Sequence, residues 1–327
     1  MENIERESAE VRKQIRQNRK MIKDLPVLEN ETIEPKGVDL SLYRRIGEEI
    51  TKVVKHKLGM LYVKEIIRPK YALKDSTMLP PDGQKSVKIA PMPLMPVDKC
   101  IADTSLLAEI LLQKYEYHVP FYRQIQQYRH LGMKGLTEST LDGWFKKTVE
   151  LLKPLYEELK REVFSCNYVQ ADETTVPVIN KEKHRADKEY LWMETEDIKY
   201  SPGSQIGKAI TYAYTRWDNM MECLEDGRLL WDNNLAENVI RPITLGRKNY
   251  LFCGNHEAAA NISVISSLLA TCKAHDVNPR DYLNDVIAQM PYYKKAAREQ
   301  LLNLLPHKWK LKHPECVLTE QKNESDN

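Results

Sequence analysis

The acidic residues best suited to chemistry lie in two short stretches far apart in the chain. The first, "NYVQADETTVPVIN", places Asp172 and Glu173 among β-prone residues. The second, "WDNNLAENVIRP", places Glu237 one turn into an expected helix. A carboxylate in an apolar strand is costly to bury without a cation or a partner. Because strand residues alternate between faces, Asp172 is the candidate for a buried role and Glu173 for the solvent face.

Glu237 also has an interpretation without chemistry. Asn234 lies three residues before it, which is the spacing of a capping box, and a carboxylate is favoured near the positive end of a helix. Arg241, Arg247 and Lys248 follow, and they either contact phosphates or are ordinary surface charges. A chemical role for Glu237 therefore requires a second carboxylate from elsewhere in the chain.

The composition predicts a folded chain of two or three domains. The 327 residues are 42% hydrophobic and 29% charged, with a formal net charge of +2, which excludes a disordered or strongly basic protein. No apolar run approaches the length of a membrane span, and the N-terminus lacks the apolar region of a signal peptide, so we expect a cytoplasmic protein. The six cysteines are scattered without a CxxC pair, and we expect them to be small buried side chains rather than zinc ligands or disulfides.

The strongest local charge lies in residues 51–74. Seven Lys and Arg residues stand there against Glu65 alone, and seven minus one gives a local charge of +6. Lys64, Arg68 and Lys70 are the candidates from this stretch for contacts to DNA phosphates. A solvated face without a nucleic-acid partner is the alternative interpretation.

The elements that must position these residues divide the chain into five parts. Residues 1–25 read as a polar helix, and residues 26–96 as a small β-rich module punctuated by Pro and Gly. Residues 97–165 form a helical block, residues 166–292 hold a β-hairpin followed by helices, and residues 293–327 form a C-terminal tail.

The helical block has the outline of a helix-turn-helix. A first helix begins behind Asp103 or Thr104, and a later one opens with Ser139 and Asp142 in capping-box spacing. The segment "GMKGLTE" joins two of the helices. A DNA-reading second helix is one interpretation, and an ordinary helical hairpin is the other.

Two further features of the later chain are predicted from local signals. The polar turn "KEKHRAD" joins two strand candidates into a hairpin. Asn278 as cap and Pro279 at the first position begin a helix near the C-terminus. We expect His256 and His275 at helix ends, in surface or capping roles rather than as metal ligands.

The stretches "ADETTVPV", "LEDGRLLWDNNLAENVIRPITLGRKNYLFCG" and "HVPFYRQIQQYRHLG" resemble transposases of the insertion sequence 66 family, and the likeness extends over most of the chain. The resemblance implies a DDE triad on a ribonuclease-H-like core, with Asp172 and Glu237 as two of its acids. It also implies Mg²⁺ ions held by these acids, which clamp the attacking and leaving oxygens of a phosphodiester. Further implications are DNA with terminal inverted repeats as substrate, accessory transposition proteins or a second copy as partners, and the bacterial nucleoid as location.

The sequence departs from the family pattern at two places. Relatives carry further strands, a middle aspartate and a segment rich in His and Arg between the two matched acids, whereas here "YLWMETEDIKY" runs directly into "SPGSQIGKAITYA". About ten residues remain in this interval, too few for one βα unit. Asp187, Asp197 and Asp218 lie nearby, but none stands in a matching motif. The stretch before "RPKYA", where relatives often bear a cysteine zinc motif, has no cysteine, so we expect no zinc.

Taken together, the sequence predicts a mostly helical α+β fold with a small β-rich module, a helix-turn-helix-like block and a partial ribonuclease-H-like core. The expected function is that of a DNA transposase of the insertion sequence 66 type that is catalytically incomplete because the middle aspartate segment is absent. The alternative is a catalytically dead DNA-binding remnant or a regulator of transposition. The candidate site residues are Asp172 and Glu237 for catalysis and Mg²⁺ binding, and Lys64, Arg68, Lys70, Arg241, Arg247 and Lys248 for DNA binding.

Overall fold

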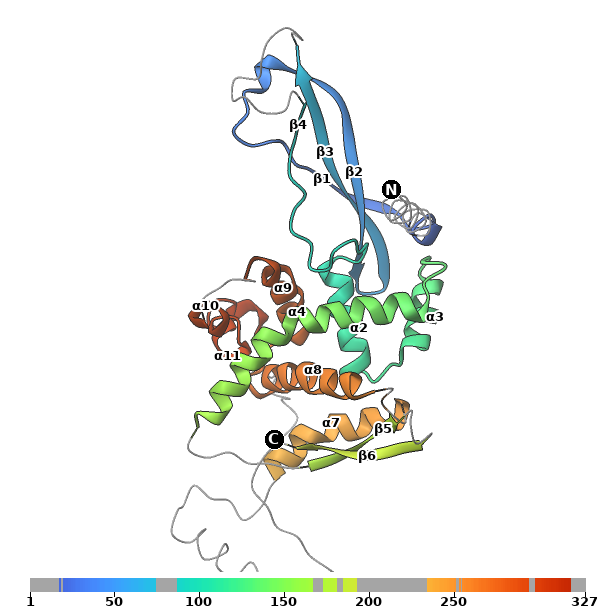
Figure 1. Cartoon of the computed structure of the whole chain (residues 1–327), viewed down its shortest axis with the longest axis vertical. Helices are drawn as coiled ribbons and strands as arrows, with labels where there is room; N and C mark the ends of the chain where they lie inside the picture. The colour runs from blue at the N-terminus through green and yellow to red at the C-terminus, as the bar shows by residue number, and fades with distance from the viewer. Residues whose placement is uncertain are drawn as a thin grey trace, which may run out of the picture. The chain divides into compact units, whose positions relative to one another are not determined.

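The computed structural model describes residues 18, 20–74, 87–166, 173–180, 185–192, 234–250, 253, 255–293 and 298–318. The chain divides into two compact units, which are coloured by residue number in Figure 1. Unit 1 comprises residues 1–155 with 271–327, and unit 2 comprises residues 156–270. Among the described helices, none combines the length and the apolar character needed to cross a membrane.

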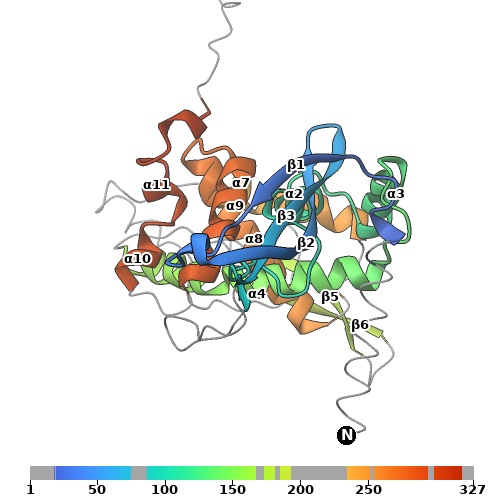
Figure 2. The same ribbon diagram turned by 90° about the horizontal axis from the view of Figure 1, so that it is seen from above.

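A four-stranded sheet forms the N-terminal part of unit 1 (Figure 2). The long strand β3 (Met60–Leu73) pairs antiparallel with β2 (Tyr43–Lys57) along one edge. Its other edge pairs with β1 (Val27–Thr32) in parallel and then with β4 (Val87–Ile89) in antiparallel fashion. A short 3-10 helix, η1 (Leu40–Leu42), precedes β2. The mixed α+β class and the N-terminal β-rich module are therefore confirmed.

Helix α2 (Thr104–Tyr115) forms the centre of unit 1 and packs against β2 and α9 (Pro279–Gln289). A helix that is apolar on all sides must lie inside a core, and the consecutive side chains of Ile110, Leu111 and Leu112 are fully buried. The predicted caps are present. Asp103 accepts a hydrogen bond from the Thr104 backbone N–H at 2.7 Å, and Asn278 accepts one from the Arg280 backbone N–H at 3.0 Å.

Helices α3 (Phe121–His130) and α4 (Glu138–Phe164) follow α2 in the helical block. The rings of Tyr115 and Phe121 each contact the ring of Phe145, with centroids 6.0 and 5.5 Å away, so that aromatic side chains join all three helices. The capping box predicted at Ser139 is wrong. The helix begins at Glu138, and the Thr137 hydroxyl accepts the Thr140 backbone N–H at 3.2 Å.

The C-terminal residues complete the core of unit 1. After α8 (His256–Ala274) and α9 come η2 (Met290–Tyr293), α10 (Arg298–Leu302), α11 (Pro306–Trp309) and η3 (Pro314–Cys316). The Trp309 side chain is 2% exposed, contacts the Tyr282 ring edge-on and donates its indole N–H to Asp285 at 2.7 Å. The residues that the sequence assigned to a tail therefore help to hold α9 in place.

A buried carboxylate connects three elements of unit 1. Glu109 on α2 is 3% exposed and accepts hydrogen bonds from the Arg280 guanidinium on α9 and, at 2.7 Å, from the Gln113 amide. The Nδ1 atom of His56, on β2, lies 3.6 Å from Glu109 Oε2. Burial lowers the pKa of His56 although Glu109 acts in the opposite direction. His56 is therefore neutral near neutral pH, and the ion pair of Glu109 is the one with Arg280.

Unit 2 contains the predicted hairpin, formed by β5 (Glu173–Asn180) and β6 (Arg185–Trp192) in antiparallel register. The polar turn is shorter than predicted, because β6 already begins at Arg185 and Asp187 pairs with Val178. Helix α7 (Asn234–Tyr250) packs against β5. Figure 1 shows this helix beside the hairpin.

The expectation for the cysteines is confirmed in part. Cys253 and Cys272 are buried, as expected, and Cys100 and Cys316 are half-buried. Cys166 is exposed, so the prediction is wrong for this residue. It follows the C-terminal end of α4, where no further element covers it among the described residues. Cys223 lies outside the described residues.

Candidate functional site

Glu237 lies in the first turn of α7, on its exposed face. Ala236 and Ile240, on the adjoining face, are buried, with exposures of 4% and 8%. Across the part of the chain that the structure describes, the Glu237 carboxylate takes part in no hydrogen bond or ion pair, so the capping-box interpretation has no contact to support it. The helix therefore presents an acid that has no partner among the described residues.

Asp172, the second candidate acid, lies outside the described residues. The described part of β5 begins at the next residue, Glu173, so the expected place of Asp172 in mid-strand is not tested. Because β5 packs against α7, the backbone that follows Asp172 lies beside the helix that bears Glu237. The fold thus brings β5, the strand that follows Asp172, against the helix of Glu237.

Two of the three basic residues of α7, Arg241 and Lys248, extend the same exposed face. Arg241 and Lys248 are exposed, and Arg247 is half-buried. Arg241 follows Glu237 by four residues, which places both on one side of the helix. On one face, a carboxylate can bind a metal cation while neighbouring basic side chains bind a phosphate.

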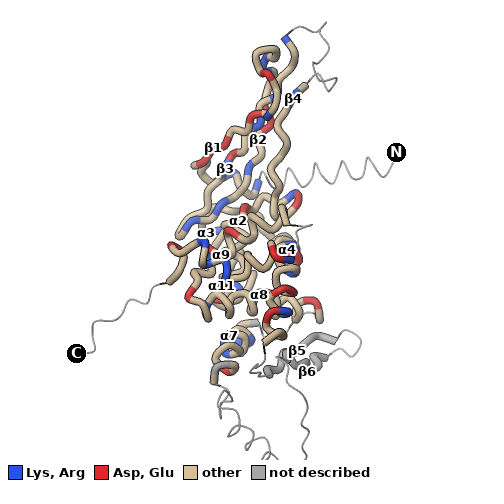
Figure 3. Tube along the Cα trace, turned by 90° about the vertical axis from the view of Figure 1, so that its left-hand side faces the viewer, with Lys and Arg blue, Asp and Glu red and all other residues tan. Residues whose placement is uncertain are grey.

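The basic stretch of the sheet proves to be largely neutralised. Lys64 Nζ lies 2.7 Å from Glu31, and Arg68 and Lys70 lie 2.6 and 2.7 Å from the two oxygens of Glu49. Figure 3 shows basic and acidic residues interspersed along β1, β2 and β3. These three cations, predicted to contact DNA, are thus each placed against a carboxylate of a neighbouring strand.

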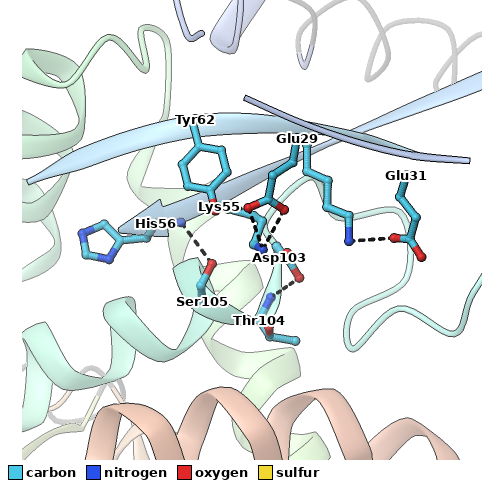
Figure 4. A network of polar contacts seen from close by, with 9 residues as sticks. Glu29, Glu31, Lys55, His56, Tyr62, Asp103, Thr104 and Ser105 are labelled. Carbon is cyan, nitrogen blue, oxygen red and sulfur yellow. Dashed lines mark hydrogen bonds and ion pairs between the residues drawn. The ribbon is translucent and has the colours of Figure 1, made fainter. Parts of the chain in front are cut away.

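Glu29 on β1 shows how the sheet pairs its charges (Figure 4). Its carboxylate accepts hydrogen bonds from Tyr62 at 2.5 Å and from Lys55 at 3.0 Å. The hydrogen bond from Tyr62, and next that from Lys55, lowers the pKa of Glu29. The carboxylate therefore stays ionised and offsets the lysine charge.

The count that gave a local charge of +6 left these acids out, because it covered residues 51–74 and they precede that stretch. Residues 27–74 contain ten Lys and Arg residues and seven Asp and Glu residues, and ten minus seven gives +3. Strand pairing brings the carboxylates of β1 and the start of β2 against the cations of β3. A count over paired strands, rather than over consecutive residues, would have found them.

No set of metal ligands is complete within the described ranges. Three or more His, Cys, Asp or Glu side chains do not gather there in a way that could hold an ion. His256 and His275 lie at the two ends of α8, as predicted. The ring of His275 contacts that of His307, and burial lowers its pKa.

The sequence after residue 98 matches a family model described as "Transposase IS66 family" in two segments, residues 99–200 and 192–261. Residues 267–307 match a second model, described as "IS66 C-terminal element". The chain belongs to the IS66 family of transposases. The two segments of the first match share residues 192–200, so no stretch of chain separates them.

Three curated relatives are proteins of Sinorhizobium fredii (strain NBRC 101917 / NGR234) that are named as uncharacterized. Protein y4hP is 31% identical over 155 residues, which cover 47% of this chain and 28% of the relative. Protein y4qI is 39% identical over 100 residues, which cover 31% of this chain and 18% of the relative. The chain thus matches less than a third of the length of either protein.

A third relative matches over a longer range. Protein y4jD is 21% identical over 398 residues, which cover 81% of this chain and 76% of the relative. This range is longer than the whole chain of 327 residues, so y4jD carries residues inside the matched region that this chain lacks. No solved structure matches the chain at a significant level.

Proposed function

We propose that this protein is an IS66-type DNA transposase whose strand-cleaving site is incomplete. The observation that carries the proposal is the pair of family matches that share residues 192–200. The overlap supports the absence of the strands and the middle aspartate that the family resemblance implies between the two acids. The extra residues of y4jD inside its matched region agree with a shortened chain.

Two acids of the implied triad remain, Asp172 and Glu237. The packing of α7 against β5 supports their placement at one site of a partial ribonuclease-H-like core. The third acid has no evident substitute. Asp187 lies within the hairpin opposite Val178, and Asp197 and Asp218 lie outside the described residues.

The donor set fits the two-ion site of a DDE enzyme poorly. Bound Mg²⁺ would supply charge stabilisation to the attacking and leaving oxygens of a phosphodiester, and it demands near-ideal oxygen geometry. Two carboxylates from separate elements leave most positions around a pair of ions to water. The roles we assign to this chain are therefore limited to weak cation binding at Asp172 and Glu237 and phosphate contacts from Arg241, Arg247 and Lys248. We propose no zinc site.

The test is a nicking assay on DNA that carries the terminal inverted repeats of its own element, with Mg²⁺ or Mn²⁺. We expect the wild-type chain to nick no faster than Asp172→Ala and Glu237→Ala. Loss of several kcal/mol of transition-state stabilisation corresponds to a rate at least about 10³-fold below that of a complete site. Nicking by the wild type but by neither variant would show that the site is complete.

A second candidate is a regulator that occupies DNA ends without chemistry. The observation that favours it is the intact helical block, in which α2, α3 and α4 are joined through Tyr115, Phe121 and Phe145. Such a protein binds terminal-repeat DNA with an affinity that falls as salt rises, because phosphate contacts release counterions. Affinity that does not change with salt contradicts this role.

A further inference from the structure

A small open cavity lies in unit 1 between residues 97–100 and one face of the first turns of α4. Ser139, Thr140, Gly143 and Lys147 line it from the helix, and Lys99 lines it from the opposite segment. Its volume is about 190 Å³, below the roughly 300–1,000 Å³ of pockets for drug-sized ligands. The cavity is therefore suited to a single small group rather than to a whole nucleotide.

The two lysines at this cavity differ from those of the sheet. Lys99 and Lys147 are exposed, and neither pairs with a carboxylate among the residues that the structure describes. Asp98 is the one acid among the described lining residues, so two positive charges face one negative charge. Burial raises the pKa of the Cys100 thiol to about 12, and this side chain therefore adds no charge. The cavity has a net positive lining.

Packing within the protein does not explain why the residue at Gly143, in the wall of this cavity, is a glycine. A glycine inside a helix costs about 1 kcal/mol relative to alanine. A Cβ atom added at Gly143 would meet no heavy atom within 4 Å, and the residue does not adopt a left-handed φ. Neither a close neighbour nor the backbone requires glycine here. A missing side chain at the wall of the cavity instead allows another molecule to approach the helix backbone.

We propose that this cavity binds a phosphate of the DNA backbone. The Thr140 hydroxyl is hydrogen-bonded to the Thr137 hydroxyl at 2.9 Å. Lys99 and Lys147 supply the charge, the Ser139 hydroxyl supplies a hydrogen-bond donor, and Gly143 leaves the wall open. Lysine and hydroxyl contacts of this kind fix the position of a protein on a duplex without reading its sequence. The inference rests on the proposed function, because it takes DNA as the ligand. It assigns the contact between α4 and the DNA backbone to two lysines that the local charge pattern did not indicate.

The experiment is a titration of the full chain with a labelled DNA duplex at several salt concentrations. Each neutralised phosphate adds about 0.9 to the slope of log affinity against log salt, so Lys99→Gln with Lys147→Gln, which removes the contact to one phosphate, should lower the slope by about 1 and the affinity at low salt by about tenfold. The matched control is Lys52→Gln with Lys64→Gln, which removes two lysines that are paired with Glu65 and Glu31. We expect this control to change both quantities less.

Two single variants separate binding from folding. Gly143→Ala fills part of the cavity and improves helix propensity, so we expect DNA affinity to fall several-fold while the thermal unfolding midpoint stays equal or rises. Asp98→Asn removes the opposing charge, and we expect DNA affinity to rise. A fall in the midpoint of Gly143→Ala would contradict the open wall inferred for this residue.

The possible outcomes distinguish the two proposals. Salt-dependent DNA binding by the wild type that the double variant and Gly143→Ala leave unchanged overturns the cavity proposal and leaves the proposed function standing. A wild-type chain that binds no DNA overturns both. If inorganic phosphate raises the unfolding midpoint of the wild type but not of the double variant, while DNA binding is equal in both, the cavity binds small anions only and the proposal is wrong.

Discussion

Glu109 in unit 1 and Glu237 in unit 2 show two different uses of a carboxylate on a helix. Glu109 is buried and meets an arginine, a glutamine and a histidine from three elements. Glu237 is exposed and has no partner in the described part of the chain. An acid that stabilises a fold has its counter-groups built around it, whereas an acid that serves a ligand must keep its oxygens free. The comparison supports a structural role for Glu109, whereas the described structure assigns no structural contact to Glu237.

The largest expected effect in this comparison is that of Glu109→Ala. Removal of the carboxylate leaves the Arg280 guanidinium partly buried without its partner, and breaking a buried ion pair costs roughly 3–5 kcal/mol. We expect about 3 kcal/mol, near the low end of that range, because the Arg280 side chain retains 26% exposure. Denaturant unfolding measures the loss.

Glu150→Ala is the control for that variant. Glu150 also pairs with a basic side chain, Lys153, but its own side chain is 73% exposed. Exposed pairs contribute about 0–1 kcal/mol, so the unfolding free energy should change little. Equal losses for Glu109→Ala and Glu150→Ala would remove the distinction between a structural and a surface carboxylate.

The next effect is a pH dependence that centres on His56. Burial lowers the pKa of His56 below its ordinary value of 6.5, so the unfolded chain binds a proton that the folded chain resists. Stability is therefore fully present above pH 6.5 and is lost as the pH falls through the lower folded pKa. The same direction holds for His118 and His275, whose pKa values burial also lowers.

We expect the unfolding free energy to decrease as the pH falls below about 6.5, and to decrease less steeply in His56→Asn. The measurement is the denaturant midpoint at a series of pH values. If the His56→Asn chain has the same pH profile as the wild type, the burial of this histidine does not contribute to the pH dependence of the unfolding free energy.

The smallest effect is expected at Glu237. Because this side chain is exposed and unpartnered in the described structure, Glu237→Gln should change the unfolding free energy by no more than about 0.5 kcal/mol. Ile240→Ala, on the buried face of the same helix, should cost about 2–5 kcal/mol. Thermal unfolding of the two variants checks the pair, and a large loss for Glu237→Gln would make this acid structural, like Glu109.

Local signals in the sequence predicted several elements correctly. Asp103 and Asn278 cap α2 and α9, because a short polar side chain before an apolar helical run satisfies the first free N–H groups. The hairpin of β5 and β6 was predicted from two β-prone runs around a polar turn. The start of α4 was predicted wrongly because Thr137 and Ser139 can both cap a helix. The backbone conformation of the folded chain decides between them, and it places Thr137 at the cap.

The charge pattern shows where sequence reasoning stopped. Lys64, Arg68 and Lys70 formed a basic stretch in the sequence, yet the structure places each against Glu31 or Glu49. Neither Lys99 nor Lys147 was selected from the sequence. The glycine within the helix, Gly143, could have indicated the cavity that these two lysines line. Which cations remain without carboxylates is a property of strand and helix pairing, and the linear sequence does not contain it.

The sequence by itself predicted the β-rich module, the hairpin, the helices with clear caps, the family and two candidate acids, because periodicity, caps and short motifs act over a few residues. The tertiary structure alone decided which charges meet. Arg280 pairs with Glu109 across 171 positions of the chain, and β1 reaches β3 in parallel register. Coulomb attraction and desolvation depend on distance in space and on burial, and folding sets both quantities.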